Sequence, residues 1–210
     1  MAYPQSDLKL GMPEGKEFRR AYWACISFMD AQVGKVLRAL DESGERDNTL
    51  VLFSDHGLHL GEHDWWNKVA LWERTTRVPF ILAGPMVQDP GRACASLVEL
   101  TDIFPTFTSY ADLPAAPGQM GRSLVPALTN PAAQWDHTAY TMVMRPGGKT
   151  GRTIRTARFR YIEWDDDRAG VEIYDHASDP SEFRNLATDP AYARHREGLS
   201  KSLACFRMGR

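Results

Sequence analysis

The sequence predicts an α/β fold that carries, at its C-terminal end, a small antiparallel sheet with a covering helix. Two short and continuous apolar runs, at residues 50–53 and 78–83, are expected to be strands buried on both faces, as in an α/β sheet. A long amphipathic helix precedes them and a shorter helix follows. Beyond about Pro114 the chain changes to segments rich in β-branched and aromatic residues, which favour antiparallel strands.

The composition is that of an ordinary globular chain. Of the 210 residues 43% are apolar, and 25 basic side chains stand against 27 acidic ones. These values argue against collagen-like, disordered and disulfide-scaffold classes and give no reason to expect nucleic acid as a partner. No apolar stretch is long enough to span a bilayer, and no signal peptide begins at Met1. The cysteines Cys25, Cys94 and Cys205 are expected to be small buried side chains.

The first predicted element is a helix that follows an irregular segment over residues 1–15. Apolar side chains recur every three or four residues from Phe18 to Leu40, which is the spacing of one helix face. Gly44 is the expected helix stop. The next strand ends abruptly at Ser54-Asp55-His56-Gly57, and the strand after it is followed by a helix that opens at Thr101.

The C-terminal part is expected to form an antiparallel sheet. Its three predicted strands are Thr138–Met144, Thr153–Trp164 and Val171–Tyr174. Residues 165–170 separate the last two strands as a hairpin loop. A helix over Ala191–Leu203 is expected to cover the sheet. We therefore expect two domains, one over residues 1–114 and a small α+β subdomain over residues 115–210.

The stretch from Asp55 to Lys68 is the richest in groups that could carry chemistry, because it holds three of the six histidines. Ligand sites in α/β sheets lie beyond the carboxyl ends of strands. Asp55 and His56 could converge on one metal ion there, since Gly57 permits the required turn. From chemistry alone a metal site and a polar loop capping the strand are equally good interpretations, and a site would favour zinc or another transition metal.

Several segments, in the same order along the chain, are similar to segments of the sulfatases. They are Tyr22–Gly34, Asn48–Lys68, Thr76–Ile81, Gly121–Leu124, Gly151–Thr156, Glu172–Asp175 and Asp179-Pro180. Over nearly its whole length the chain resembles the iduronate-2-sulfatase-like members of the alkaline phosphatase superfamily. The resemblance implies that residues 1–114 are the C-terminal portion of the catalytic α/β sandwich, and that the chain is a fragment of a longer sulfatase.

The resemblance implies an enzyme that hydrolyses sulfate esters, with a sulfated sugar such as a sulfated uronic acid residue as its substrate. The family's nucleophile is a formylglycine made from the first residue of a Cys/Ser-x-Pro/Ala-x-Arg motif. No cysteine or serine of this sequence begins such a motif. The nucleophile is therefore expected outside these 210 residues, which alone should bind calcium weakly and turn over nothing. The compartment and the oligomeric state stay open.

The resemblance also assigns roles to particular residues. It implies that Asp55 and His56 hold one Ca²⁺ and that Lys68 is a catalytic residue that contacts the sulfate oxygens. The physical roles agree, because a divalent cation and an ammonium group both neutralise charge on a sulfuryl group. His63 lies in the Gly-Glu-His segment of the family and either reaches the leaving group or braces the loop, with bracing favoured.

Trp66 is a candidate for substrate binding, because an aromatic face suits the apolar face of a sugar. Trp65 and Trp72 share this alternative, although core packing is the commoner role of tryptophan. His59 has no clear family counterpart and is expected at the surface or just behind the site. Two other functions remain open, a phosphoesterase or phosphonate hydrolase of the same superfamily and a non-catalytic binding module.

Arginine and aspartate groups near these residues are expected to be structural. Arg74 and Arg77 are predicted to form surface or helix-end ion pairs. The run Asp165-Asp166-Asp167 is predicted to be a solvated turn and not a second metal site.

Overall fold

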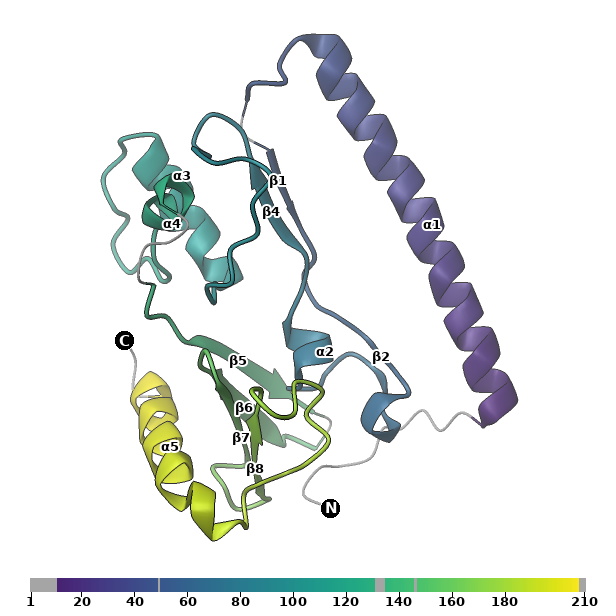
Figure 1. The fold of residues 1–210 in the computed structure, drawn as a ribbon, viewed down its shortest axis with the longest axis vertical. Helices are drawn as coiled ribbons and strands as arrows, with labels where there is room; N and C mark the ends of the chain where they lie inside the picture. Colours follow the sequence, from purple (N-terminus) through teal and green to yellow (C-terminus); the bar gives the residue numbers. More distant parts are fainter. Residues whose placement is uncertain (1–10, 49, 131–134, 146, 208–210) are drawn as a thin grey trace.

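The computed structural model describes residues 11–48, 50–130, 135–145 and 147–207. Figure 1 shows a long helix on one side, a middle part with short strands and helices, and a sheet with a helix along it at the C-terminal end. The helices are α1 (Met12–Ser43), α2 (Glu73–Thr76), α3 (Ile103–Tyr110), α4 (Val125–Thr129) and α5 (Ala193–Arg207), with 3₁₀ turns at Glu62–Asp64, Leu100–Asp102 and Pro190–Tyr192. The strands are β1 (Leu50–Phe53), β2 (His59–Leu60), β3 (Trp66–Asn67), β4 (Phe80–Ala83), β5 (Ala139–Met144), β6 (Thr150–Arg155), β7 (Phe159–Trp164) and β8 (Val171–Asp175).

Helix α1 begins earlier than its apolar periodicity predicts. It starts at Met12, with Pro13 in the first turn, where a backbone N–H has no helical partner to lose. The predicted irregular lead-in is therefore wrong from Met12 onward, and its residues 1–10 lie outside the described residues. The predicted stop is confirmed, because Gly44 adopts the left-handed conformation at φ 76°.

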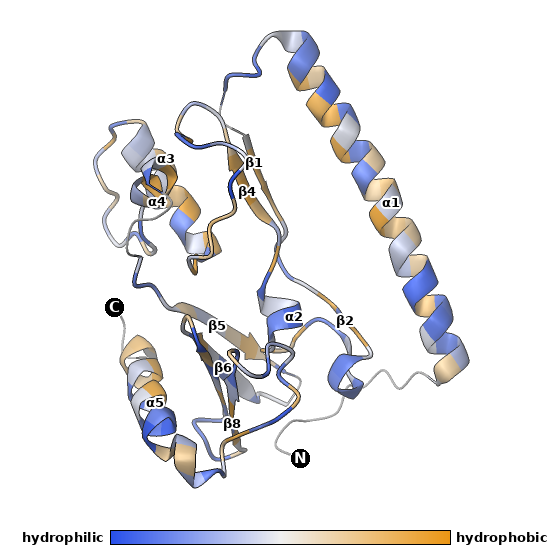
Figure 2. Ribbon diagram, in the orientation of Figure 1, coloured by the Kyte–Doolittle hydropathy of each residue, from blue (hydrophilic) through white to orange (hydrophobic). Residues whose placement is uncertain are grey.

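The apolar face of α1 is largely uncovered by the described residues. Figure 2 shows apolar residues along its whole length, and Met29 and Val36, which belong to the predicted face, are 50% and 63% exposed. Contact with the rest of the chain is concentrated near the N-terminal end of the helix. There the ring of Trp66 lies so close to Gly15 that a Cβ on this residue would be 2.9 Å from it. Helix α1 is thus held at one end.

Strands β1 and β4 form an antiparallel pair in which Phe53 lies opposite Phe80. The two strands are confirmed, but the prediction that they are buried on both faces is wrong for this chain. Phe53 is 49% exposed and Ile81 is 53% exposed. The reason is that neither hydrophobic core cluster of the described residues includes a residue of β1 or β4, so their faces lack a packed layer.

The C-terminal sheet has the antiparallel order β5-β6-β7-β8. One predicted strand, over residues 153–164, is wrong, because the chain reverses within it and forms β6 and β7. The reversal has none of the usual turn residues and is closed by Thr156, whose N–H donates to the Phe159 carbonyl over 2.8 Å. The predicted hairpin loop at residues 165–170 is confirmed, and Asp165, Asp166 and Asp167 all adopt positive φ.

The sheet is covered on both faces. On one face α5 packs Leu199 and Leu203 against a cluster that includes Ile154, Tyr161 and Ile173. This confirms the predicted covering helix, which appears as the yellow helix beside the sheet in Figure 1. On the other face residues 65–72 pack against Ile162, Trp164 and Tyr174. Every residue of β7 is buried as a result.

The cysteine prediction is wrong, since Cys25, Cys94 and Cys205 are all exposed. The helix predicted to open at Thr101 is confirmed, with a 3₁₀ turn that leads into α3. Within the described ranges, no helix has both the length and the apolar character that crossing a membrane requires.

Candidate active site

Asp55 and His56 follow the last residue of β1. The Asp55 carboxylate accepts the backbone N–H of His56 over 3.0 Å, and its second oxygen lies 3.6 Å from Nε2 of His56. Both side chains reach the surface, with the Asp55 side chain 82% exposed. Gly57 is required next, because a Cβ there would lie 1.9 Å from the Arg74 carbonyl oxygen. The structure thus brings the two predicted metal ligands together.

The pair has donor atoms that fit a divalent cation. Calcium binds oxygen ligands at about 2.3–2.6 Å. The Asp55 oxygen and His56 Nε2 are therefore close enough to each other to bind the same ion. Nδ1 of His56 lies 2.9 Å from the Gly57 carbonyl oxygen, and an N–H donated there leaves Nε2 with a free lone pair. A carboxylate suits calcium, whereas an imidazole is more typical of transition metals.

The Gly61–Lys68 loop begins after β2 and contains β3, which pairs with β2 in a short hairpin. Its backbone turns through left-handed conformations at His63 and Asp64, with φ values of 58° and 55°. The indole N–H of Trp65 donates to the Lys68 carbonyl over 2.9 Å and so fixes the backbone at the predicted sulfate-binding lysine. Lys68 itself is exposed.

His63 is stacked between two aromatic rings. Its ring lies 4.6 Å from that of Trp72 and 4.8 Å from that of Phe183. Burial lowers the pKa of the imidazole, and a hydrogen bond with the backbone of Ser181 opposes that change. This is the geometry expected of the bracing alternative, while a role toward the leaving group stays a prediction.

The three tryptophans of this region are buried. Trp65, Trp66 and Trp72 are 7%, 8% and 1% exposed. Trp66 packs beneath α1, where the Phe18 ring meets it edge to face at 5.7 Å and the Arg19 guanidinium lies over it. The structure therefore gives Trp66 the core-packing role, the second of its two alternatives, and not a sugar-facing one.

His59 is fully buried and is not a surface residue. Its ring lies 5.7 Å from that of His63 and 5.3 Å from that of Trp72. Neither ring nitrogen has a hydrogen-bond partner among the described residues. Burial lowers the pKa of His59 to about 4, which keeps the ring neutral around pH 7.

Arg74 and Arg77 form the predicted ion pairs, and residues 165–167 form the predicted turn. Arg77 is 80% exposed and lies 3.9 Å from Glu73, while Arg74 lies 4.0 Å from Glu62. Asp166, on the hairpin loop, pairs with Arg152 of β6. The arginine contacts are thus ion pairs at the surface, and the aspartate run is a turn, as the sequence indicates.

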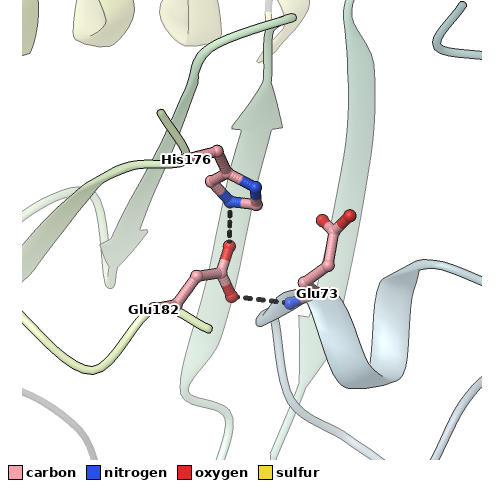
Figure 3. Close-up of side chains that lie close together, drawn as sticks. All are labelled: Glu73, His176 and Glu182. Carbon is pink, nitrogen blue, oxygen red and sulfur yellow. Dashed lines mark hydrogen bonds and ion pairs between the residues drawn. The ribbon is translucent and has the colours of Figure 1, made fainter. Parts of the chain in front are cut away.

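A buried ion network beside the loop was missed by sequence reasoning. Arg160 is 1% exposed, and its guanidinium lies 2.5 Å from carboxylate oxygens of both Glu73 and Glu182. Figure 3 shows Glu182 accepting a bond from the Glu73 backbone N–H and facing His176. Burial alone would raise the pKa of both carboxyl groups. Arg160 acts against it together with Arg155 at Glu73, and together with His176 and the Glu73 backbone N–H at Glu182, so each pKa lies below its usual range.

The network has the ligand types of a metal centre but is occupied by arginine. Oxygens of Glu73 and Glu182 and a nitrogen of His176 lie within 4.8 Å of one another. The guanidinium groups of Arg160, which contacts both carboxylates, and of Arg155, which lies 3.3 Å from Glu73, already balance the two negative charges without a metal ion. The group instead ties α2, which follows the candidate site, to the C-terminal sheet. No sequence motif predicts this network, because its residues come from three segments that lie far apart along the chain.

A second buried group, Glu99, Asp102 and His137, is also structural. Nε2 of His137 lies 3.2 Å from Glu99 and 3.7 Å from Asp102. Each carboxylate also accepts a backbone N–H, from Tyr140 and Arg122 respectively, over 2.8 Å. These bonds fasten the start of α3 to β5.

Two family models match the chain, and together they cover nearly all of it. Residues 3–113 match the family described as Sulfatase, and residues 61–208 match N-sulphoglucosamine sulphohydrolase, C-terminal. Both models describe hydrolases of sulfated compounds, and each covers more than half of the chain. The chain belongs to the sulfatase family, as its motifs indicated.

Related proteins extend this assignment. A sulfatase of Formosa agariphila is 35% identical over 95% of this chain, and an N-acetylglucosamine-6-O-sulfatase of Bacteroides thetaiotaomicron is 31% identical over 90% of it. The chain covers 38% and 35% of these two relatives, so it spans somewhat more than a third of their length.

Solved structures confirm the predicted fold class, the C-terminal part of a sulfatase α/β sandwich with a small antiparallel sheet. A protein solved in complex with its substrate D-glucosamine-2-N,6-O-disulfate has a TM-score of 0.86 at 29% identity, over 95% of this chain and 43% of its own. A phosphonate monoester hydrolase of Silicibacter pomeroyi has a TM-score of 0.82 at 27% identity, over 96% and 43%.

Proposed function

We propose that this chain supplies part of the active site of a sulfuric ester hydrolase that acts on sulfated sugars, such as sulfated uronic acid residues. The observation that carries the proposal is the Asp55–His56 pair after the end of β1, with the exposed Lys68 directly after the β2–β3 hairpin that follows. The relatives support the substrate class, because two of them are an N-acetylglucosamine-6-O-sulfatase and a protein bound to a sulfated glucosamine.

Asp55 and His56 are proposed to hold one Ca²⁺. When bound, the ion would offset the negative charge of the sulfate group. His56 contributes Nε2 because its other nitrogen faces the Gly57 carbonyl, and Asp55 contributes a carboxylate oxygen. Calcium takes six to eight oxygen ligands, so this pair supplies a minority of the coordination shell.

Lys68 is proposed to bind the sulfate oxygens through its ammonium group. Its backbone is held by the Trp65 indole, which leaves the side chain at the surface of the loop. His63 is proposed to brace this loop, since it is stacked against Trp72. The formylglycine expected from the family would supply the nucleophile, and we propose that it lies outside these residues. We further propose a boundary near residue 114 between the catalytic part and the C-terminal subdomain.

Calcium titration of the 210-residue chain tests the metal proposal. Asp55→Asn is expected to weaken Ca²⁺ binding at least about tenfold in isothermal titration calorimetry, because it removes a charged ligand. Asp64→Asn is the matched control, since Asp64 is an exposed carboxylate of the following loop. Equal calcium affinity in wild type and Asp55→Asn would overturn the metal assignment.

Ester binding separates the proposal from its alternatives. With Ca²⁺ present, a sulfated monosaccharide is expected to bind, and Lys68→Met to weaken that binding, without turnover. Preference for a phosphonate monoester over the matching sulfate ester would favour the phosphonate hydrolase alternative, which the Silicibacter pomeroyi structure supports. Hydrolysis at ordinary enzyme rates would contradict the placement of the nucleophile outside the chain. Sugar binding that Lys68→Met leaves unchanged would favour a binding module.

A further inference from the structure

A stack of three rings ends in an exposed phenylalanine beside the Gly61–Lys68 loop. Trp72 is 1% exposed at the bottom of the stack, His63 lies in the middle and Phe183 is 65% exposed at the top. The planes of Phe183 and His63 differ by 23°, so one face of the phenyl ring covers the imidazole. The exposed fraction of Phe183 shows that its other side is open to solvent.

The ring of Phe183 is held in place by its own segment, residues 179–186. Glu182, the preceding residue, is buried and adopts the left-handed conformation at φ 62°, which a glutamate keeps only where its surroundings enforce it. The Arg160 network enforces it, because the Glu182 carboxylate bonds to Arg160, to His176 and to the Glu73 backbone. Phe183 is therefore presented on a rigid turn.

The other end of the segment is fastened as well. The Asn185 side chain accepts the backbone N–H of Ile173 in β8, and the Leu186 N–H donates to the Ile173 carbonyl over 2.9 Å. The backbone of Ser181, which precedes Glu182 in this segment, forms a hydrogen bond with the His63 imidazole. Two contacts thus connect the segment to His63, one from a backbone group and one from an aromatic face.

An aromatic face open to solvent is what a sugar ring requires. The C–H groups on one face of a pyranose pack against an aromatic ring, which removes apolar surface from water. Trp65, Trp66 and Trp72 cannot serve, since all three are buried. Among the aromatic side chains that contact this loop in the described part of the chain, Phe183 is the one with its ring mostly exposed.

We propose that Phe183 is a substrate-binding residue, on whose open face the pyranose ring of a sulfated sugar packs while Lys68 binds the sulfate group. The inference rests on the proposed function and adds a sugar contact supplied by the C-terminal subdomain. Phe183 then sets a preference for sulfate esters that carry a ring over sulfate itself.

Binding measurements on the 210-residue chain with Ca²⁺ test the inference. The probes are D-glucosamine-2-N,6-O-disulfate, a 2-O-sulfated uronic acid and inorganic sulfate. Calorimetry and saturation-transfer NMR measure the binding of each probe. Phe183→Ala is expected to weaken binding of at least one sulfated sugar roughly two- to tenfold. Phe183→Tyr keeps the affinity, and Phe183→Leu loses most of it because an aliphatic side chain offers no flat face. Inorganic sulfate binds all variants alike.

Phe104→Ala is the matched control, because Phe104 is 57% exposed on α3, which lies apart from β2 and the loop after it in Figure 1. It is expected to bind as the wild type does. Equal sugar affinity in wild type and Phe183→Ala would overturn the inference and leave the proposed function standing. A Phe183→Leu variant as tight as Phe183→Tyr would also overturn it. Failure of the wild type to bind sulfate or either sugar would overturn the proposed function, and the inference with it.

Discussion

The β1–β4 pair and the C-terminal sheet differ in burial in the opposite sense to their composition, since β1 and β4 are wholly apolar and β7 carries charged residues. Strands β1 and β4 leave Leu52, Phe53 and Ile81 between 39% and 53% exposed. Strand β7 buries every residue, including Arg160 and Glu163. The difference comes from what lies against each face, since α5 and residues 65–72 cover the C-terminal sheet. Burial is therefore a property of the layers and not of the strand sequence.

The largest expected effect comes from removing Arg160. Arg160→Leu leaves the Glu182 carboxylate buried without its main partner, which costs roughly 3–5 kcal/mol of folding free energy. Arg77→Leu is the matched control, because Arg77 also pairs with Glu73 but is 80% exposed, and it is expected to change stability by no more than about 0.5 kcal/mol. Urea unfolding measures both. Equal changes in the free energy of unfolding would show that burial in the C-terminal part does not determine how much an ion pair contributes to stability.

The next effect compares one residue type across the two sheets. Ile173→Ala in β8 removes a fully buried side chain and is expected to cost roughly 2–5 kcal/mol. Ile81→Ala in β4, at 53% exposure, is expected to cost less than about 1 kcal/mol. Thermal or urea unfolding of the two variants measures the two losses in the free energy of unfolding, and hence their ratio. A loss at Ile81 as large as that at Ile173 would contradict the difference in burial between the two sheets.

The smallest effect concerns the buried His59 in the N-terminal part. Its pKa is about 4 in the folded chain against 6.5 as a free side chain, so the unfolded chain takes up the proton first as pH falls. Stability contributed at His59 is complete above pH 6.5 and is lost toward pH 4, with about 2 kcal/mol lost at pH 5. His59→Phe is expected to remove that loss. His195→Phe, at an exposed position on α5, is the control expected to retain it.

Local features of the fold and the site could be predicted from the sequence. The spacing of apolar residues in α1, the stop at Gly44 and the loop at 165–170 depend on neighbours within a few positions. The approach of Asp55 to His56 is equally local, because both follow the end of one strand and Gly57 lets the chain turn.

Long-range features could not be predicted from the sequence. The side-chain roles of Trp66 and Trp72 depend on Phe18 and on Glu172, which lie far away along the chain. The reversal at Thr156 is closed by a threonine in place of a glycine or proline, so composition gave no sign of it. The Arg160 network joins three segments, and a charged residue within a strand ordinarily indicates a solvated face.

The bond between the Glu73 backbone and the Glu182 side chain spans 109 residues. Ribosomes add roughly 5–20 residues per second, so the loop that carries His63 and Lys68 leaves the ribosome roughly 5–20 s before the segment that braces it. Until β7 and β8 follow, Trp65, Leu71 and Trp72 have no sheet to pack against. The candidate site is therefore completed late in synthesis, and a nascent chain halted before Glu182 would present these tryptophans to chaperones.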